Sequence, residues 1–171
     1  MKTNLRHHFD EHFQILEFMN YKLGLSKGAD LTWEFPTMQR PWLQPSIFML
    51  LTKFCWFFGI KNPDSLAIIY RIFSAIFAQF SIFLLALCSY PWFTNSNLRR
   101  INLIAMNILW FIPFIHVRTS SENFSGALFI IGFVLITIFY NQSRRYENIF
   151  RAPFHFALAS GFFLGLAFVS R

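Results

Sequence analysis

Residues 66–90 read LAIIYRIFSAIFAQFSIFLLALCSY, a block in which Arg71 is the one charged residue. An α-helix needs about 20 mostly apolar residues to cross the hydrocarbon core of a bilayer, and this block is long enough. Tyr90 and Trp92 stand at its end, where membrane helices place aromatic residues at the boundary with water. The block predicts a transmembrane helix and decides the class of the protein.

Further apolar blocks follow towards the C-terminus. The sequence predicts an all-α, polytopic membrane protein with four spans, at about residues 66–90, 101–117, 121–140 and 153–169. The last of these contains Gly161 and Gly165, a spacing of small residues that lets another helix approach closely.

The composition agrees with a membrane protein. Hydrophobic residues make up 55% of the chain and charged residues only 13%, whereas soluble domains carry about 25% charged residues. The net charge of +7 does not indicate nucleic-acid binding, because the basic residues are spread along the chain and no nucleic-acid-binding motif accompanies them. Arg99 with Arg100, and Arg144 with Arg145 and Arg151, mark loops that the positive-inside rule assigns to the cytoplasm.

Residues 1–65 form a more polar first unit, which precedes the helix bundle of residues 66–171. Its apolar run PSIFMLLTKFCWFFG, residues 45–59, is too short to span and predicts a helix lying in the membrane interface. The charge-derived orientation places both residues 1–65 and Arg118 outside the cytoplasm. Because the first thirty residues hold no signal peptide, we expect a further span upstream and a chain truncated at both ends.

The segment HHFDEHFQILEF, residues 7–18, holds the densest group of polar residues. Asp10, Gln14 and Glu17 share one face of a helix by their spacing. A carboxylate here could act as a general base towards an acceptor hydroxyl, or Asp10 could simply cap the helix. The neighbouring histidines match no metal-site spacing, so we expect no metal.

Two other places could bind a substrate. The segment LTWEF, residues 31–35, and Arg40 supply a tryptophan, a carboxylate and a guanidinium that suit a sugar or a phosphate, although the tryptophans could equally anchor a loop at the membrane surface. Arg118 precedes the start of a predicted helix, an arrangement that suits an anion such as a lipid phosphate. The alternative is an arginine that extends to lipid headgroups beside an ordinary serine or threonine helix cap.

Together these motifs resemble glycosyltransferase family 22, the lipid-phosphate-dependent mannosyltransferases of GPI-anchor and lipid-linked oligosaccharide assembly, and especially its bacterial members. The resemblance rests on four motifs in the expected order: His8-Phe9-Asp10-Glu11 with Gln14 and Glu17, Thr32-Trp33-Glu34-Phe35, Arg40-Pro41, and Arg118-Thr119 with Ser121-Glu122. It differs at Phe9, where proline is common in the eukaryotic members.

The resemblance implies the N-terminal portion of a GT-C fold, with the acidic motif in the first extracytoplasmic loop. Asp10 would be the catalytic base and Glu11 would assist it. The substrate-binding residues would be His8, Gln14, Glu17, Trp33, Glu34, Arg40, Arg118, Thr119, Ser121 and Glu122.

The expected reaction is inverting transfer of a hexose, mannose first, from a polyprenyl or dolichyl phosphate to a hydroxyl of a glycan or glycolipid. No cofactor is expected. The location would be a bacterial inner membrane, or the endoplasmic reticulum membrane of a eukaryote, and the fragment alone is expected to be inactive. A different GT-C enzyme, transferring arabinose or galacturonic acid, and a non-enzymatic transporter subunit or assembly factor are the alternatives.

Overall fold

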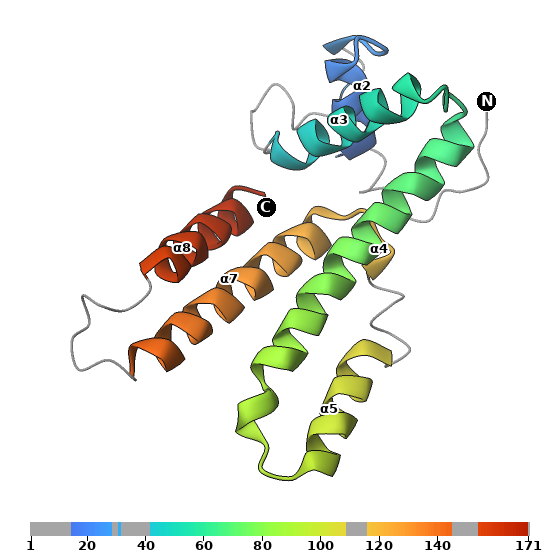
Figure 1. Cartoon of the computed structure of the whole chain (residues 1–171). Coiled ribbons are helices and arrows are strands. Elements are labelled where there is room, and N and C mark those ends of the chain that lie inside the picture. Colours follow the sequence, from blue (N-terminus) through green and yellow to red (C-terminus); the bar gives the residue numbers. More distant parts are fainter. Residues whose placement is uncertain (1–14, 29–30, 32–41, 109–115, 145–153, 171) are drawn as a thin grey trace.

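The computed structural model describes residues 15–28, 31, 42–108, 116–144 and 154–170. Within these ranges the chain is helical and contains no strand. The helices, shown in Figure 1, are α2 (Glu17–Lys22), α3 (Leu43–Phe57), α4 (Pro63–Cys88), the short 3-10 turn η3 (Tyr90–Trp92), α5 (Ser96–Ile108), α7 (Ser121–Ser143) and α8 (Phe154–Val169). The predicted all-α fold class is confirmed.

The longest helix, α4, contains the apolar block that decides the fold. It begins at Pro63, three residues before the predicted start, because the side chain of Asn62 accepts a hydrogen bond from the backbone N–H of Asp64 and caps the helix. Proline suits this first helical position, since it has no N–H that would need a partner. The predicted helix is therefore present and extends slightly towards the N-terminus.

The burial pattern of α4 is the reverse of that in a soluble protein. Its buried positions include the small residues Ala78 and Ser81, only 2% and 1% exposed, whereas Ile76 and Phe80 are 65% and 53% exposed. Helices in lipid pack through small residues and turn large apolar side chains outward. By length and composition, α4 and α7 are each long and apolar enough to cross a bilayer.

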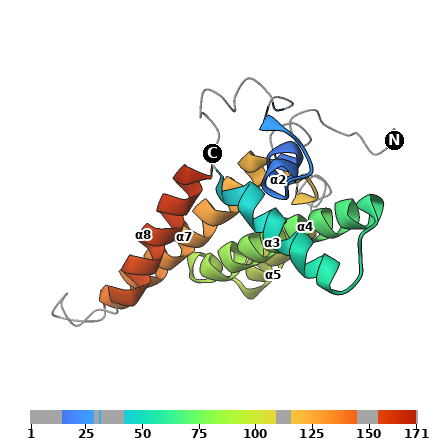
Figure 2. The same cartoon turned by 90° about the horizontal axis from the view of Figure 1, so that it is seen from above.

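Helix α7 lies between α4 and α8 and packs against both (Figures 1 and 2). Two serine hydroxyls hold α7 and α8 together: Ser160 donates to the carbonyl oxygen of Gly132 at 2.8 Å, and Ser125 donates to that of Ala167 at 2.8 Å. Such hydrogen bonds are useful between membrane helices, where no hydrophobic effect drives association.

The close helix approach expected at the Gly161 and Gly165 positions occurs elsewhere. A Cβ atom at either glycine would meet no atom within 4 Å, so no described helix lies against them. Instead, Gly132 of α7 makes the close contact, against Leu164 of α8. A spacing of small residues does not by itself show whether another helix packs against it.

Helix α5 runs back along the lower part of α4 in Figure 1 and packs against it. The side-chain amide of Gln79 donates to the side-chain oxygen of Asn107 at 2.6 Å and joins the two helices. The second predicted span, about residues 101–117, includes residues 109–115, which lie outside the described residues.

Helices α2 and α3 cover the end of α4 at which that helix begins (Figure 1). One face of α3 is buried and includes Gln44, Phe48, Thr52 and Cys55. The opposite side exposes the large apolar residues Leu50, Phe54 and Phe57, and Phe58, directly after the helix, is exposed as well. This two-faced helix corresponds to the apolar run of residues 45–59, and its exposed apolar side suits the membrane interface.

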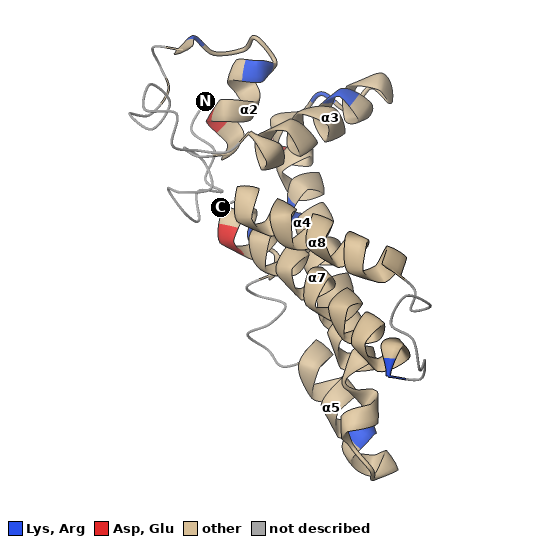
Figure 3. Cartoon of the chain, turned by 90° about the vertical axis from the view of Figure 1, so that its left-hand side faces the viewer, with Lys and Arg blue, Asp and Glu red and all other residues tan. Residues whose placement is uncertain are grey.

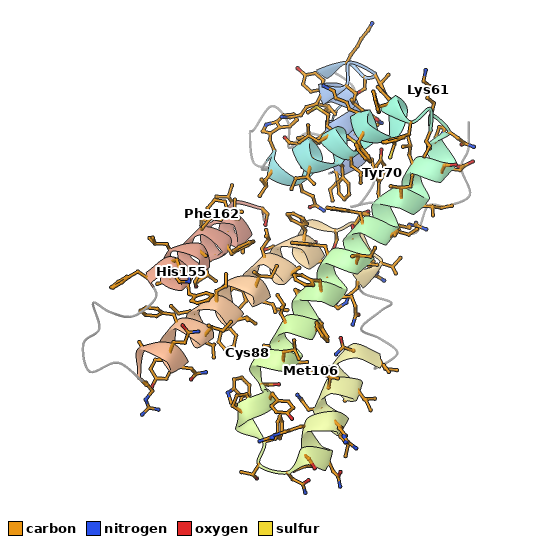
Figure 4. The ribbon with its side chains drawn as sticks, viewed as in Figure 1. Lys61, Tyr70, Cys88, Met106, His155 and Phe162 are labelled. Atoms are coloured by element: carbon orange, nitrogen blue, oxygen red, sulfur yellow. The ribbon has the colours of Figure 1, made fainter. Side chains whose placement is uncertain are left out.

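A buried hydroxyl pair joins α3 to α4. The hydroxyl groups of Thr52 and Tyr70 are 2.6 Å apart, and Thr52 also donates to the carbonyl oxygen of Phe48 at 2.7 Å. Figure 4 labels Tyr70 on the part of α4 that α3 crosses. The ring of Phe48 packs against that of Tyr70, with the ring centroids 5.3 Å apart.

Thr52→Val is expected to lower the stability of the protein, because valine keeps the shape but leaves the Tyr70 hydroxyl buried beside an apolar group. The cost of one unsatisfied buried polar group is about 1–3 kcal/mol. Thermal unfolding in detergent measures it, with Tyr90→Phe as a control because Tyr90 is 49% exposed. Equal unfolding temperatures for Thr52→Val and the unaltered protein would show that the pair contributes nothing.

The charged residues lie near the two ends of the helix bundle (Figure 3). Near the turn between α4 and α5, Arg99 lies over the ring of Tyr90 at 4.4 Å, and at the end of α7 Arg144 lies 5.5 Å from the centroid of Tyr140. Pairs of arginine with tyrosine are typical of membrane boundaries. Arg118 lies at the other end of α7, directly before that helix begins.

Candidate functional site

Five of the twelve residues predicted for the site lie in described parts of the chain: Glu17, Arg118, Thr119, Ser121 and Glu122. The others lie outside the described residues, and these are His8, Asp10, Glu11, Gln14, Trp33, Glu34 and Arg40. Four of the five lie in the segment that precedes and begins α7.

The Arg118 turn, residues 116–120, leads directly into α7. Ser120 caps α7, because its hydroxyl oxygen accepts a hydrogen bond from the backbone N–H of Asn123 at 3.3 Å. The side-chain amide of Asn123 reaches back and donates to the carbonyl oxygens of His116 at 3.1 Å and Arg118 at 2.9 Å. The predicted helix cap is thus present. Through the side chain of Asn123, α7 also forms hydrogen bonds with the turn that precedes it.

A second amide reaches the Arg118 turn from α3. Gln44, only 3% exposed, donates through Nε2 to the carbonyl oxygen of Thr119 at 3.1 Å and, less closely, to that of Ser120 at 3.5 Å. These contacts link residues 75 and 76 positions apart in the sequence. Helix α3 therefore contacts the turn that precedes α7.

The two amides change the electrostatics of the turn. Asn123 and Gln44 together engage the carbonyl oxygens of residues 116, 118, 119 and 120, so the partial negative charges of these oxygens face amide donors. The N-terminus of a helix carries a partial positive charge from its unpaired N–H groups. Arg118 adds a positive charge shortly before this helix start, and Glu122 adds a negative charge in its first turn.

Three buried polar atoms around the turn have no hydrogen-bond partner among the described residues. They are Oε1 of Gln44, Oγ of Ser121 and Nδ1 of His116. Buried polar groups are normally paired, so each of these atoms calls for a reason. Gln44 contacts the turn, His116 belongs to it, and Ser121 begins the helix that follows it.

Helix α2 places Glu17 at the same end of the molecule. Glu17 stands in the first turn of α2, which packs against α3. Trp42, directly before α3, packs against the rings of Phe18 at 5.2 Å and Tyr21 at 6.2 Å, and Lys22 lies 4.6 Å from its ring centroid. The structure thus gathers the five described site residues near one end of the helix bundle.

The sequence alone did not single out Gln44 or Asn123 as parts of the site. Asn123 begins an Asn-Phe-Ser sequence, which matches the pattern of a glycosylation sequon. Its amide instead donates to two carbonyl oxygens of the turn. The signal in the sequence was its position three residues after the cap Ser120, where a side chain can reach back over the helix start.

A comparison with known protein families identifies the family of this chain. The profile of the Alg9-like mannosyltransferase family matches residues 2–169, nearly the whole chain. The chain belongs to the Alg9-like mannosyltransferase family. The resemblance to glycosyltransferase family 22 is therefore confirmed.

Membership makes the chain a glycosyltransferase of a mannosyltransferase family, located in a membrane. It also implies a lipid-linked sugar as donor and a glycan as acceptor. No curated protein and no solved structure matches the chain. The roles of individual residues in this Alg9-like chain therefore rest on its own geometry and chemistry.

Proposed function

We propose that the enzyme containing this chain transfers a hexose, mannose first, from a polyprenyl or dolichyl phosphate to a hydroxyl of a glycan or glycolipid acceptor, with inversion at the sugar. The observation that carries the proposal is the Arg118 turn. There an arginine stands beside the N-terminus of a membrane helix, and two amides engage the neighbouring carbonyl oxygens.

The lipid phosphate would bind at this turn. In a phosphate-linked sugar the leaving group gains negative charge as the bond to the sugar breaks. Positive groups placed where that charge develops lower the barrier, because they bind the transition state more strongly than the substrate. The guanidinium of Arg118 and the N–H groups at the start of α7 are suited to this task, with the hydroxyl of Ser121 as a further donor.

Asp10 would act as the base in the same step. As the acceptor oxygen attacks the anomeric carbon, its proton passes to the carboxylate of Asp10, and the electron pair of the breaking carbon–oxygen bond moves to the phosphate. Attack opposite the leaving group gives inversion. Glu11 would assist Asp10, while Trp33, Glu34 and Arg40 would shape the sugar and acceptor site.

The remaining residues of the acidic motif, His8, Gln14 and Glu17, would contact the substrates. We propose no metal or other cofactor, because a lipid phosphate leaves with less charge than a nucleotide diphosphate and needs less neutralisation. Membrane lipids and the lipid-linked donor would be the partners, and nucleic acid would not be one.

The proposed topology follows from the charges. Residues 1–65 would form an extracytoplasmic loop with juxtamembrane helices, and residues 66–171 a multi-pass bundle, with Arg99 and Arg144 on the cytoplasmic side. Arg118, at the opposite end of α7 from Arg144, would then face the extracytoplasmic side. The membrane would be a bacterial inner membrane, or that of the endoplasmic reticulum in a eukaryote.

Replacing Arg118 tests the phosphate contact. Arg118→Ala is expected to lower kcat/KM for the lipid-phosphate donor on the order of 10²-fold, as the loss of one preorganised charged donor does in other enzymes. Arg118→Lys should lose less, because lysine keeps the charge but not the planar fork of donors. The measurement is transfer of labelled mannose from a polyprenyl phosphate in membranes that contain the protein with its complete reading frame.

Arg144→Ala serves as the matched control, since it removes the same charge at the other end of α7. Its kcat/KM should stay close to that of the unaltered protein. Equal kcat/KM for Arg118→Ala and the unaltered protein would exclude the phosphate contact.

A further inference from the structure

Gln44 stands out among the buried residues of α3 because it is polar where its neighbours are apolar. Leu43 and Ile47, from the same turn of α3, pack against a cluster formed by Phe124, Leu128 and Ala167 of α7 and α8. Gln44 lies beside this apolar contact and is only 3% exposed. Its side chain therefore has little access to water and depends on the protein for its hydrogen bonds.

Stability alone does not explain a glutamine at this position. Nε2 has partners in the turn, but Oε1 is buried and has no hydrogen-bond partner among the described residues. An unsatisfied buried acceptor destabilises the folded state, whereas an apolar side chain of similar size would avoid that cost. A leucine in place of Gln44 would extend the apolar contact that Leu43 and Ile47 already make.

What the glutamine does provide is a fixed position for the turn. Arg118 is held through its own carbonyl oxygen by Asn123, at 2.9 Å, and the next carbonyl oxygen, that of Thr119, is held by Gln44 at 3.1 Å. The two anchors come from different helices, α7 and α3. With both in place, the backbone on either side of the Arg118 carbonyl cannot rotate without breaking a hydrogen bond.

We propose that Gln44 is a positioning residue, which sets the Arg118 turn for the lipid phosphate by tying it to the interfacial helix α3. This inference rests on the proposed function, because it assigns Gln44 an effect through Arg118. Gln44 itself does not touch the reacting atoms. Through Gln44, the position of α3 fixes the backbone from which the side chain of Arg118 extends.

The test replaces Gln44 by Leu, which keeps the approximate volume and removes the donor. Gln44→Leu is expected to raise KM for a polyprenyl phosphate mannose about tenfold, which corresponds to the loss of about one hydrogen bond. KM for the acceptor and the unfolding temperature should stay unchanged. Gln44→Glu should be worse for the donor, since a carboxylate cannot donate to the carbonyl oxygen of Thr119.

Thr52→Val is the matched control. Thr52 lies on the same buried face of α3 and bonds Tyr70 of α4 instead of the turn. This variant should lower the unfolding temperature and leave KM for the donor unchanged. A merely structural role for Gln44 would give the same pattern as Thr52→Val, and that result would overturn the inference.

A double-mutant cycle with Arg118→Ala separates the inference from the function on which it rests. If Gln44 acts through Arg118, then Gln44→Leu raises the donor KM in the unaltered protein and adds no further increase in Arg118→Ala. If Arg118→Ala raises the donor KM and Gln44→Leu does not, the positioning role is wrong and the phosphate contact stands. If Arg118→Ala itself leaves both KM and kcat/KM for the donor unchanged, the phosphate contact fails and the positioning role fails with it.

Discussion

Asp10→Asn is expected to lower kcat for sugar transfer by about 10²–10⁴-fold, the usual contribution of a general base. Asparagine keeps the shape of the side chain but cannot take the proton of the acceptor hydroxyl. KM for the lipid-phosphate donor should change little, because the proposed base acts on the acceptor. The measurement is the steady-state rate of mannose transfer at saturating donor and acceptor.

The same substitution distinguishes the two interpretations of Asp10 that the sequence leaves open. Asparagine caps a helix about as well as aspartate, so a capping role predicts an unaltered rate and an unaltered unfolding temperature. Asp64→Asn is a suitable control, since it makes the same chemical change in the first turn of α4, at a partly exposed position. Full turnover by Asp10→Asn would remove Asp10 from the mechanism.

Gly132→Leu is expected to disrupt the contact between α7 and α8. Even a Cβ atom at this position would lie 2.8 Å from Cγ and 3.2 Å from the backbone nitrogen of Leu164. The backbone nitrogen cannot move unless α8 itself shifts. Such a shift would also break the hydrogen bond from Ser160 to the carbonyl oxygen of Gly132.

Overpacking of a close contact costs about 1–3 kcal/mol, and a side chain as long as leucine should reach at least the upper part of that range. The unfolding temperature in detergent measures the effect. Gly126→Leu is the matched control on the same helix, because a Cβ atom there meets nothing within 4 Å. If both variants unfold at the same temperature, the α7 and α8 contact does not depend on the glycine.

Hydropathy was sufficient to predict the long helices. The blocks at residues 66–90 and 121–140 became α4 and α7, with ends shifted by a few residues. The shift at the start of α4 has a local cause, the cap formed by Asn62 and Pro63. The length and polarity of a block are local properties of the chain, so they predict a helix without any knowledge of which helices pack together.

Contacts between distant segments could not be predicted in the same way. Gln44 and Thr119 are 75 positions apart, and nothing near either residue indicates the other. The glycines illustrate the same limit: the spacing drew attention to Gly161 and Gly165, whereas Gly132 makes the close contact. Which polar or small residue is used depends on the tertiary arrangement of the helices.

The candidate site was predicted in part. The position of Arg118 directly before α7 follows from the order of polar and apolar residues, and the structure confirms it. The catalytic role of the acidic motif came from the resemblance to the family, since a carboxylate near a helix start is equally suited to capping. Family membership supports the resemblance, and the role of Asp10 stays a prediction.

The most direct test of the proposed function is a comparison of sugar donors. Membranes that contain the protein with its complete reading frame are supplied with labelled mannose either on a polyprenyl phosphate or on a nucleotide diphosphate, with formation of the lipid-linked sugar blocked. The prediction is transfer from the lipid phosphate alone, with inverted configuration at the sugar in the product. Transfer from the nucleotide diphosphate, or no transfer from the lipid phosphate, would contradict it.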